Sequence, residues 1–299
     1  MKRIKAIACV ISVAMLAGIF AGCSKTTKIT TEKFQSVCEK LDLEEFEPDG
    51  DGPEMDDLED GIFAVIDEDY IEDNEDDLNG ALESIGLSDV FEAEDIESFA
   101  FAAKASGLDG FEDLEGLDDI EDLEVDGAFA LQMTLKDDKL AEDFMDYVAD
   151  MLDYVDISTK DLTSKEYLSS KNEGYFRFHI DLAKFGALLL ENEDLMDMFD
   201  EYDIDSGDFE DAVAALSGDA AVSIEISGNQ VFVIAGLSIN TKGENLSSFA
   251  KAFGAASNPA SLPVNEKVCE ELVDNISDNT GDLFYYIYMA EMYSSSYSG

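Results

Sequence analysis

A long acidic block limits how this chain can fold. Between residues 43 and 126 the sequence has 34 acidic residues and one basic residue. Such a block is typical of a solvated face whose charges repel one another, or of partial disorder. Apolar residues nevertheless continue through the block, as in Ile62–Ile66. We therefore predict a folded region with a heavily acidic surface and loose acidic loops over Asp49–Asp60 and Asp67–Asp77.

The composition of the whole chain excludes several classes of protein. The 299 residues include 70 acidic and 18 basic ones, which gives a formal charge of −52. An apolar fraction of 46% is enough to fill a core, so disorder throughout is excluded. Nucleic acid is excluded as a partner because binding phosphates needs clustered Lys and Arg. A single histidine excludes zinc sites of the His-Glu-x-x-His kind.

The N-terminal sequence predicts a secretory signal. A basic start, Met1-Lys2-Arg3-Ile4-Lys5, is followed by the apolar stretch Ala6–Gly22 and then by Cys23. The sequence Phe20-Ala21-Gly22-Cys23 resembles the lipobox of bacterial lipoproteins. The resemblance implies that residues 1–22 are removed and that Cys23 is lipidated. The alternative is a retained transmembrane anchor, since 17 apolar or small residues reach the lower limit for spanning a bilayer.

Cleavage before Cys23 would leave an extracytoplasmic protein attached to the membrane by its lipid. Its 15 basic and 70 acidic residues would give a charge of −55. Residues 23–29 would form either a juxtamembrane tether or an ordinary polar spacer, and lysines there would be attracted to an anionic membrane surface. We predict the membrane as one partner, and divalent cations or a basic partner as another.

Hydrophobic periodicity predicts an α+β fold with one or more antiparallel sheets and helices packed on one face. Ser98–Ala105 and Ala128–Leu135 alternate in the manner of half-buried strands. Gly228-Asn229 joins two alternating runs and predicts a hairpin within residues 219–239. Further strands are predicted at Tyr175–Ile180 and in the tail at Phe284–Tyr288. Helices are predicted over Thr30–Leu41, Asp137–Val155, Leu182–Phe199, Phe209–Leu216, Leu246–Phe253 and Val264–Ile276.

A strand followed by a helix occurs twice, about 103 residues apart. This repeated strand-helix unit predicts two tandem α+β lobes over residues 30–160 and 161–299. The alternative is two unrelated β-then-α units within one domain.

Cysteines and acidic loops provide no definite binding site. Cys38 and Cys269 each lie on the apolar side of a predicted helix, which favours two buried, unpaired cysteine side chains. A disulfide between them is the alternative. The loops at Asp203–Asp208 and at Asp49–Pro53 depart from the EF-hand order. We therefore predict diffuse, weak cation binding by the acidic surface, with no fixed metal site and no cofactor.

Catalytic motifs are weak. Ser248-Phe249-Ala250-Lys251 fits the Ser-x-x-Lys of penicillin-recognising enzymes, but Ser227-Gly228-Asn229 and Thr241-Lys242-Gly243 precede it in the wrong order. His179 could act as a general base beside Arg177 and Tyr175 on an exposed strand face, although a lone surface histidine is the preferred interpretation. No catalytic residues are assigned.

Four hypotheses about function follow. The first is a non-catalytic, lipid-anchored protein that binds an envelope partner, a solute or cations. The alternative is the solute-binding component of an ABC-type importer, although those usually show the alternating strand and helix units of parallel sheets. An envelope hydrolase is the third. Adaptation of the surface to a salty habitat is the fourth and is compatible with the others.

Overall fold

The structure, a computed structural model, describes residues 30–46, 55–84, 87–111, 122–154, 156–168, 173–201, 206–254 and 258–277. It confirms the predicted α+β class. Its strands are β1 Glu44–Glu45, β2 Ile62–Ile66, β3 Ile96–Ser106, β4 Val125–Leu135, β5 Thr163–Leu168, β6 Glu173–Asp181, β7 Gly218–Ser227 and β8 Gln230–Ile239. Its longer helices are α2 Thr30–Leu41, α3 Met55–Asp60, α4 Glu68–Asp73, α5 Glu75–Ser84, α6 Asp138–Tyr154, α7 Leu182–Glu191, α8 Glu193–Glu201, α9 Gly207–Ala215 and α10 Glu244–Ala252. One more helix covers residues 266–277.

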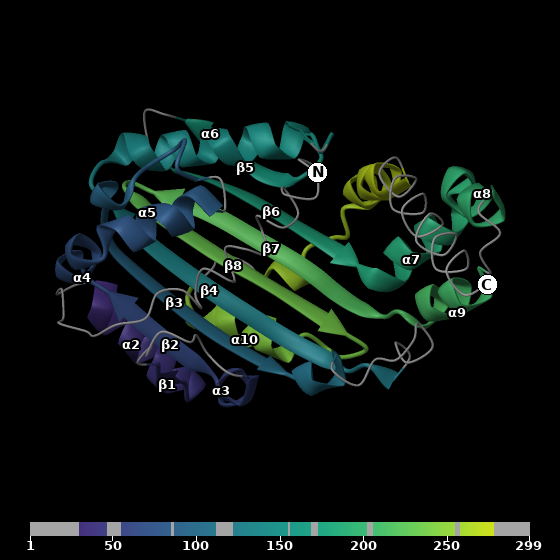
Figure 1. Cartoon of the computed structure of the whole chain (residues 1–299), viewed down its shortest axis with the longest axis horizontal. Coiled ribbons are helices and arrows are strands. Elements are labelled where there is room, and N and C mark those ends of the chain that lie inside the picture. The colour runs from purple at the N-terminus through teal and green to yellow at the C-terminus, as the bar shows by residue number, and fades with distance from the viewer. Residues whose placement is uncertain are drawn as a thin grey trace, which may run out of the picture.

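All eight strands belong to one sheet in the order β1-β2-β3-β4-β8-β7-β6-β5 (Figure 1). The pairs are antiparallel except for β1 with β2, which is parallel. The predicted hairpin is β7–β8, with Ser227 opposite Gln230 across Gly228-Asn229. At the centre β4 pairs with β8 from Val125↔Ile239 to Thr134↔Gln230. The segments on either side of residue 160 therefore contribute strands to a common sheet.

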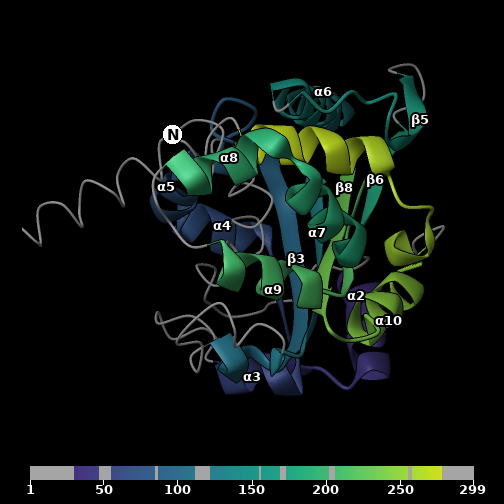
Figure 2. The ribbon, with the colours of Figure 1, turned by 90° about the vertical axis from the view of Figure 1, so that its right-hand side faces the viewer.

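Helices cover both faces of the sheet, whereas the sequence predicted one covered face. Figure 2 shows α4 and α5 on one side and α2 and α10 on the other. The reason is that the residues between the large apolar ones are alanines, such as Ala100, Ala102 and Ala130. These small side chains let α2 and α10 approach closely, and rings such as Phe34 and Phe253, 5.0 Å apart, fill the layer between.

The opposite face carries the larger side chains and the largest core cluster. There α4, α5 and α6 cover β2, β3, β4 and β8, and residues such as Phe101, Met133 and Met145 are almost fully buried. A separate cluster joins α7, α8 and α9 at one end of the molecule (Figure 1). Helix 266–277 contributes Val268 to the large cluster and Val273 to the end cluster.

Three predictions of local structure are corrected. The described end of the loop predicted over Asp49–Asp60 is the helix α3, Met55–Asp60. The acidic stretch predicted as a loop over Asp67–Asp77 is largely helical, because Asp67 Oδ1 accepts a hydrogen bond from Tyr70 N (3.1 Å) and caps α4. The helix predicted over Leu182–Phe199 is two helices, because Asn192 ends α7 and its Oδ1 accepts from Leu195 N (2.8 Å) at the start of α8. The signal, Cys23 and the tail strand at Phe284–Tyr288 lie outside the described residues.

Candidate functional site

His179 is buried, not exposed as the sequence predicted. It lies on β6 with 6% of its surface exposed. Its Nε2 is 2.5 Å from Asp219 Oδ1 on β7, and its Nδ1 is 2.7 Å from the carbonyl oxygen of Leu262. Asn265 also exchanges hydrogen bonds with the His179 backbone, at 2.9 and 3.0 Å. The segment before helix 266–277 therefore closes over this part of the sheet.

Both ring nitrogens of His179 face oxygen acceptors. The two contacts tie the ring on β6 to Asp219 of β7 and to the Leu262 segment. Both ring nitrogens are therefore engaged within the fold, which favours a structural role for His179.

Arg177, also predicted on the exposed face, is the centre of a buried polar network. Its Nη2 donates to Glu225 Oε1 (2.6 Å) and its Nε donates to Ser223 Oγ (3.1 Å). Ser223 Oγ in turn donates to the same Glu225 oxygen (2.9 Å). The guanidinium carbon lies 4.0 Å from the centre of the Tyr175 ring, a favourable cation–π contact. The network links β6 with β7.

The three motifs that superficially resemble those of penicillin-recognising enzymes do not come together. Ser248 and Lys251 are exposed on α10. Asn229 and Thr241 flank opposite ends of β8, which at ten residues is roughly 33 Å long. Each of the two binds a backbone carbonyl, Asn229 Nδ2 that of Leu135 and Thr241 Oγ1 that of Val125, so both have structural roles.

The two cysteines in the described ranges are free and buried, so they form no disulfide. Burial raises the pKa of the Cys38 thiol well above its ordinary value and that of Cys269 to about 11. Both thiols are therefore protonated and poorly nucleophilic near neutral pH. Across the ranges that the structure describes, no group of three or more His, Cys, Asp or Glu side chains could hold a metal ion. The candidate calcium loops at Asp203–Asp208 and Asp49–Pro53 fall partly or wholly outside those ranges.

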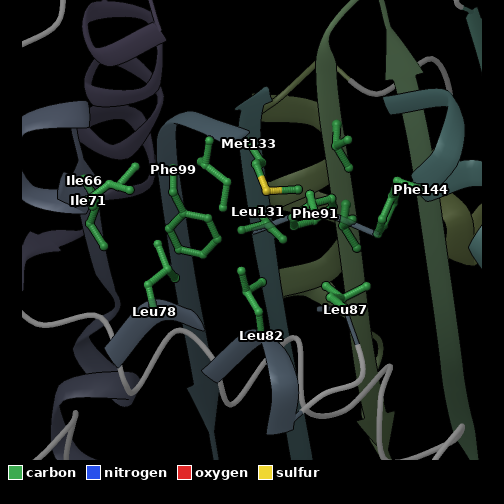
Figure 3. A pocket seen from close by; sticks show the side chains of 13 residues that line it. Ile66, Ile71, Leu78, Leu82, Leu87, Phe91, Phe99, Leu131, Met133 and Phe144 are labelled. Carbon is green, nitrogen blue, oxygen red and sulfur yellow. The ribbon is translucent and has the colours of Figure 1, made fainter. Parts of the chain in front are cut away.

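Sequence reasoning missed an apolar cavity of about 40 Å³ between the sheet and the acidic helices α4 and α5. Figure 3 shows Phe99 and Leu131 on the sheet side and Leu78 and Leu82 on the helix side. Phe91 and Phe144, with ring centres 6.3 Å apart, are also part of the lining. All the lining side chains are apolar. The available signal was the amphipathic pattern of α4 and α5, whose buried residues Ile71, Leu78 and Leu82 are separated by acids.

The chain matches no family model, no curated protein and no solved structure. No helix in the described part of the chain is long and apolar enough to cross a membrane.

Proposed function

We propose that this chain is a lipid-anchored, extracytoplasmic, non-catalytic binding protein whose acidic surface associates with a basic envelope partner or with divalent cations. Lipidation at Cys23 attaches it to the cell membrane. The observation that carries the binding role is the outer surface of α4 and α5.

That surface is almost purely anionic. From Asp67 to Ser84 the chain has nine acidic residues and no basic one, and eight of the nine carboxylates are exposed. Lys136, whose Nζ lies 3.5 Å from Glu68 Oε1, provides an ion pair at the edge of this surface. Such a field concentrates cations and speeds the association of basic partners, and added salt screens both effects.

The importer alternative receives less support. Solute-binding components usually have strand and helix units that alternate to build parallel sheets. Here β4 and β8 pair antiparallel and join the two halves of the chain in one sheet. A cleft lined by aromatic residues is the feature that would favour a solute, whereas the cavity beneath α4 and α5 is only about 40 Å³ in volume.

The anchor is tested by expressing the full chain in a bacterium fed a labelled fatty acid. Wild type and Cys9→Ser, a matched cysteine change within the signal, are expected to incorporate label and to sediment with membranes. Cys23→Ser is expected to lose the label. Equal labelling of the two variants would refute the anchor.

The binding role is tested by titrating the full chain with Ca²⁺ and with a lysine-rich peptide at several NaCl concentrations. Peptide affinity is expected to fall steeply with salt. Affinity that does not change with salt would contradict binding through the acidic surface.

A further inference from the structure

We propose that the cavity beneath α4 and α5 is a binding site for a single alkyl chain with an uncharged or cationic head, and that these two helices form a roof that moves to admit it. This inference does not depend on the lipidation of Cys23. It rests on the lining of the cavity, on how its roof is attached and on the charge at its rim.

The cavity is suited to an apolar group and unsuited to water. A buried water needs two to four polar partners, and every side chain that lines this space is apolar. Residues from distant parts of the chain form it, with Ile66 on β2, Phe99 on β3 and Val233 on β8. A methylene chain would supply the dispersion contacts that these side chains lack on the cavity side.

The roof is held to the molecule by apolar contacts, by the exposed ion pair of Glu68 with Lys136 and by a hydrogen bond to Asn79. Ile71, Leu78 and Leu82 point inward and line the cavity (Figure 3). A polar attachment comes from Asn79, whose Oδ1 accepts a hydrogen bond from Ala93 N (2.7 Å) at the start of the short helix Ala93–Asp95. Helix α4 has only six residues and α5 only ten, so neither is stable without this docking.

Charge on the outer side of the same helices opposes the docking. Side chains such as Glu72, Asp73, Glu75 and Asp76 are exposed close together, and like charges repel. The repulsion is relieved when α4 and α5 move apart. Electrostatic repulsion therefore favours opening of the roof that α4 and α5 form over the cavity.

The size and rim of the cavity specify the ligand. A space of about 40 Å³ is too small for a whole chain, so Leu78 and Leu82 must move outward as an alkyl chain enters between α5 and the sheet. The head would remain at the acidic rim. A carboxylate or phosphate there would be repelled, a hydroxyl would be tolerated and an ammonium would be attracted.

The test uses the full chain and four probes below their aggregation concentrations: dodecylamine, 1-dodecanol, dodecanoate and butylamine. Native mass spectrometry counts bound molecules, and calorimetry measures their affinity. One dodecylamine and one dodecanol are expected to bind per chain, with dodecanoate roughly tenfold weaker or worse. Butylamine, which has the same charge and a short tail, is expected not to bind at this site.

Three variants locate the site. Val233→Phe fills the cavity and is expected to reduce dodecanol affinity roughly tenfold or more. Val233→Ile adds one methylene, is the gentler change should the first variant misfold, and is expected to weaken binding by a smaller factor. Val148→Ile adds the same group to α6, where Val148 packs against the same core cluster but does not line the cavity, and is expected to have no effect.

Three results would overturn the proposal. The first is an absence of dodecanol binding to the wild-type chain. The second is butylamine binding as strongly as dodecylamine, because that would place the amine on the charged surface alone. The third is unchanged dodecanol affinity in both Val233 variants. None of these results bears on labelling at Cys23 or on salt-dependent peptide binding, so failure here is distinguishable from failure of the proposed function.

Discussion

Removing the negative charge of Glu225 tests how the buried network of β6 and β7 holds the sheet together. Arg177 is 4% exposed, and its guanidinium has Glu225 as its counter-ion in the described contacts, at 2.6 Å. Glu225→Gln keeps the shape of the side chain and removes its charge. Ser223 Oγ and the Tyr175 ring would remain near a cation that is largely shielded from water.

The expected loss is about 2–3 kcal/mol of unfolding free energy. Breaking a buried ion pair by removing one partner costs roughly 3–5 kcal/mol. We take a lower figure because 24% of the Glu225 side chain is exposed and water can partly replace the carboxylate. Arg177→Met leaves the more exposed partner behind, so its expected loss is smaller, about 1–2 kcal/mol.

Urea unfolding followed by circular dichroism measures these differences. The double variant is expected to be more stable than the sum of the single losses predicts, by roughly 1 kcal/mol or more, because the two groups interact directly. Asp143→Asn breaks the exposed pair with Lys139 on α6 (3.4 Å) and is the matched control, with an expected loss under about 0.5 kcal/mol. A loss for Glu225→Gln no larger than that of the control would refute the reasoning.

Two further predictions concern packing and burial. Gly236→Ala places a Cβ 2.8 Å from the Gly127 carbonyl and 2.9 Å from Leu246 Cδ1, so a loss of about 1–3 kcal/mol of unfolding free energy is expected. Gly80→Ala, at an exposed position on α5, meets nothing within 4 Å and should raise the unfolding free energy by up to about 1 kcal/mol. Urea unfolding that ranked the two variants in the reverse order would contradict this packing. Because burial raises the pKa of Cys269 from 9.0 to about 11, the folded state holds that proton more tightly than the unfolded state. This contribution to stability is complete below pH 9 and is lost as pH rises through 11. Urea unfolding at several pH values should therefore show that the unfolding free energy falls more between pH 9 and 11 in wild type than in Cys269→Ala. An equal fall in the two proteins would be inconsistent with the burial of Cys269.

Local pattern was enough for most strands and helices. The alternation in Ala128–Leu135 predicts β4, and Gly228-Asn229 predicts the β7–β8 turn, because both signals lie within a few neighbouring residues. The sequence does not predict the second covered face, because a strand with alanines on one side has the same alternation as a half-buried strand. Against α2 and α10, Ala100 and Ala130 are instead the small residues that let the helices approach closely.

The candidate site depends on contacts that no local pattern contains. The alternation of Tyr175, Arg177 and His179 with apolar residues predicts a solvent-exposed strand face. His179 is instead covered by a segment more than 80 residues later in the chain, through the Leu262 carbonyl and Asn265. Arg177 is buried against Ser223 and Glu225 of β7. The cavity likewise joins Ile66 to Val233, which are far apart in the sequence. Neither arrangement leaves a spacing that a reader of the sequence could recognise.

The way this chain uses its acids explains how it folds despite a charge of −52. Some carboxylates stabilise helix starts: Asp137 Oδ1 accepts from Leu140 N (3.1 Å) at α6 and Asp181 Oδ1 accepts from Lys184 N (3.0 Å) at α7. Each such cap contributes about 1 kcal/mol. Helix α4 is capped in the same way by Asp67, and Glu68 pairs with Lys136 at its edge. The remaining exposed acids of α4 and α5 repel one another, so the layer above the apolar cavity carries a dense unfavourable charge.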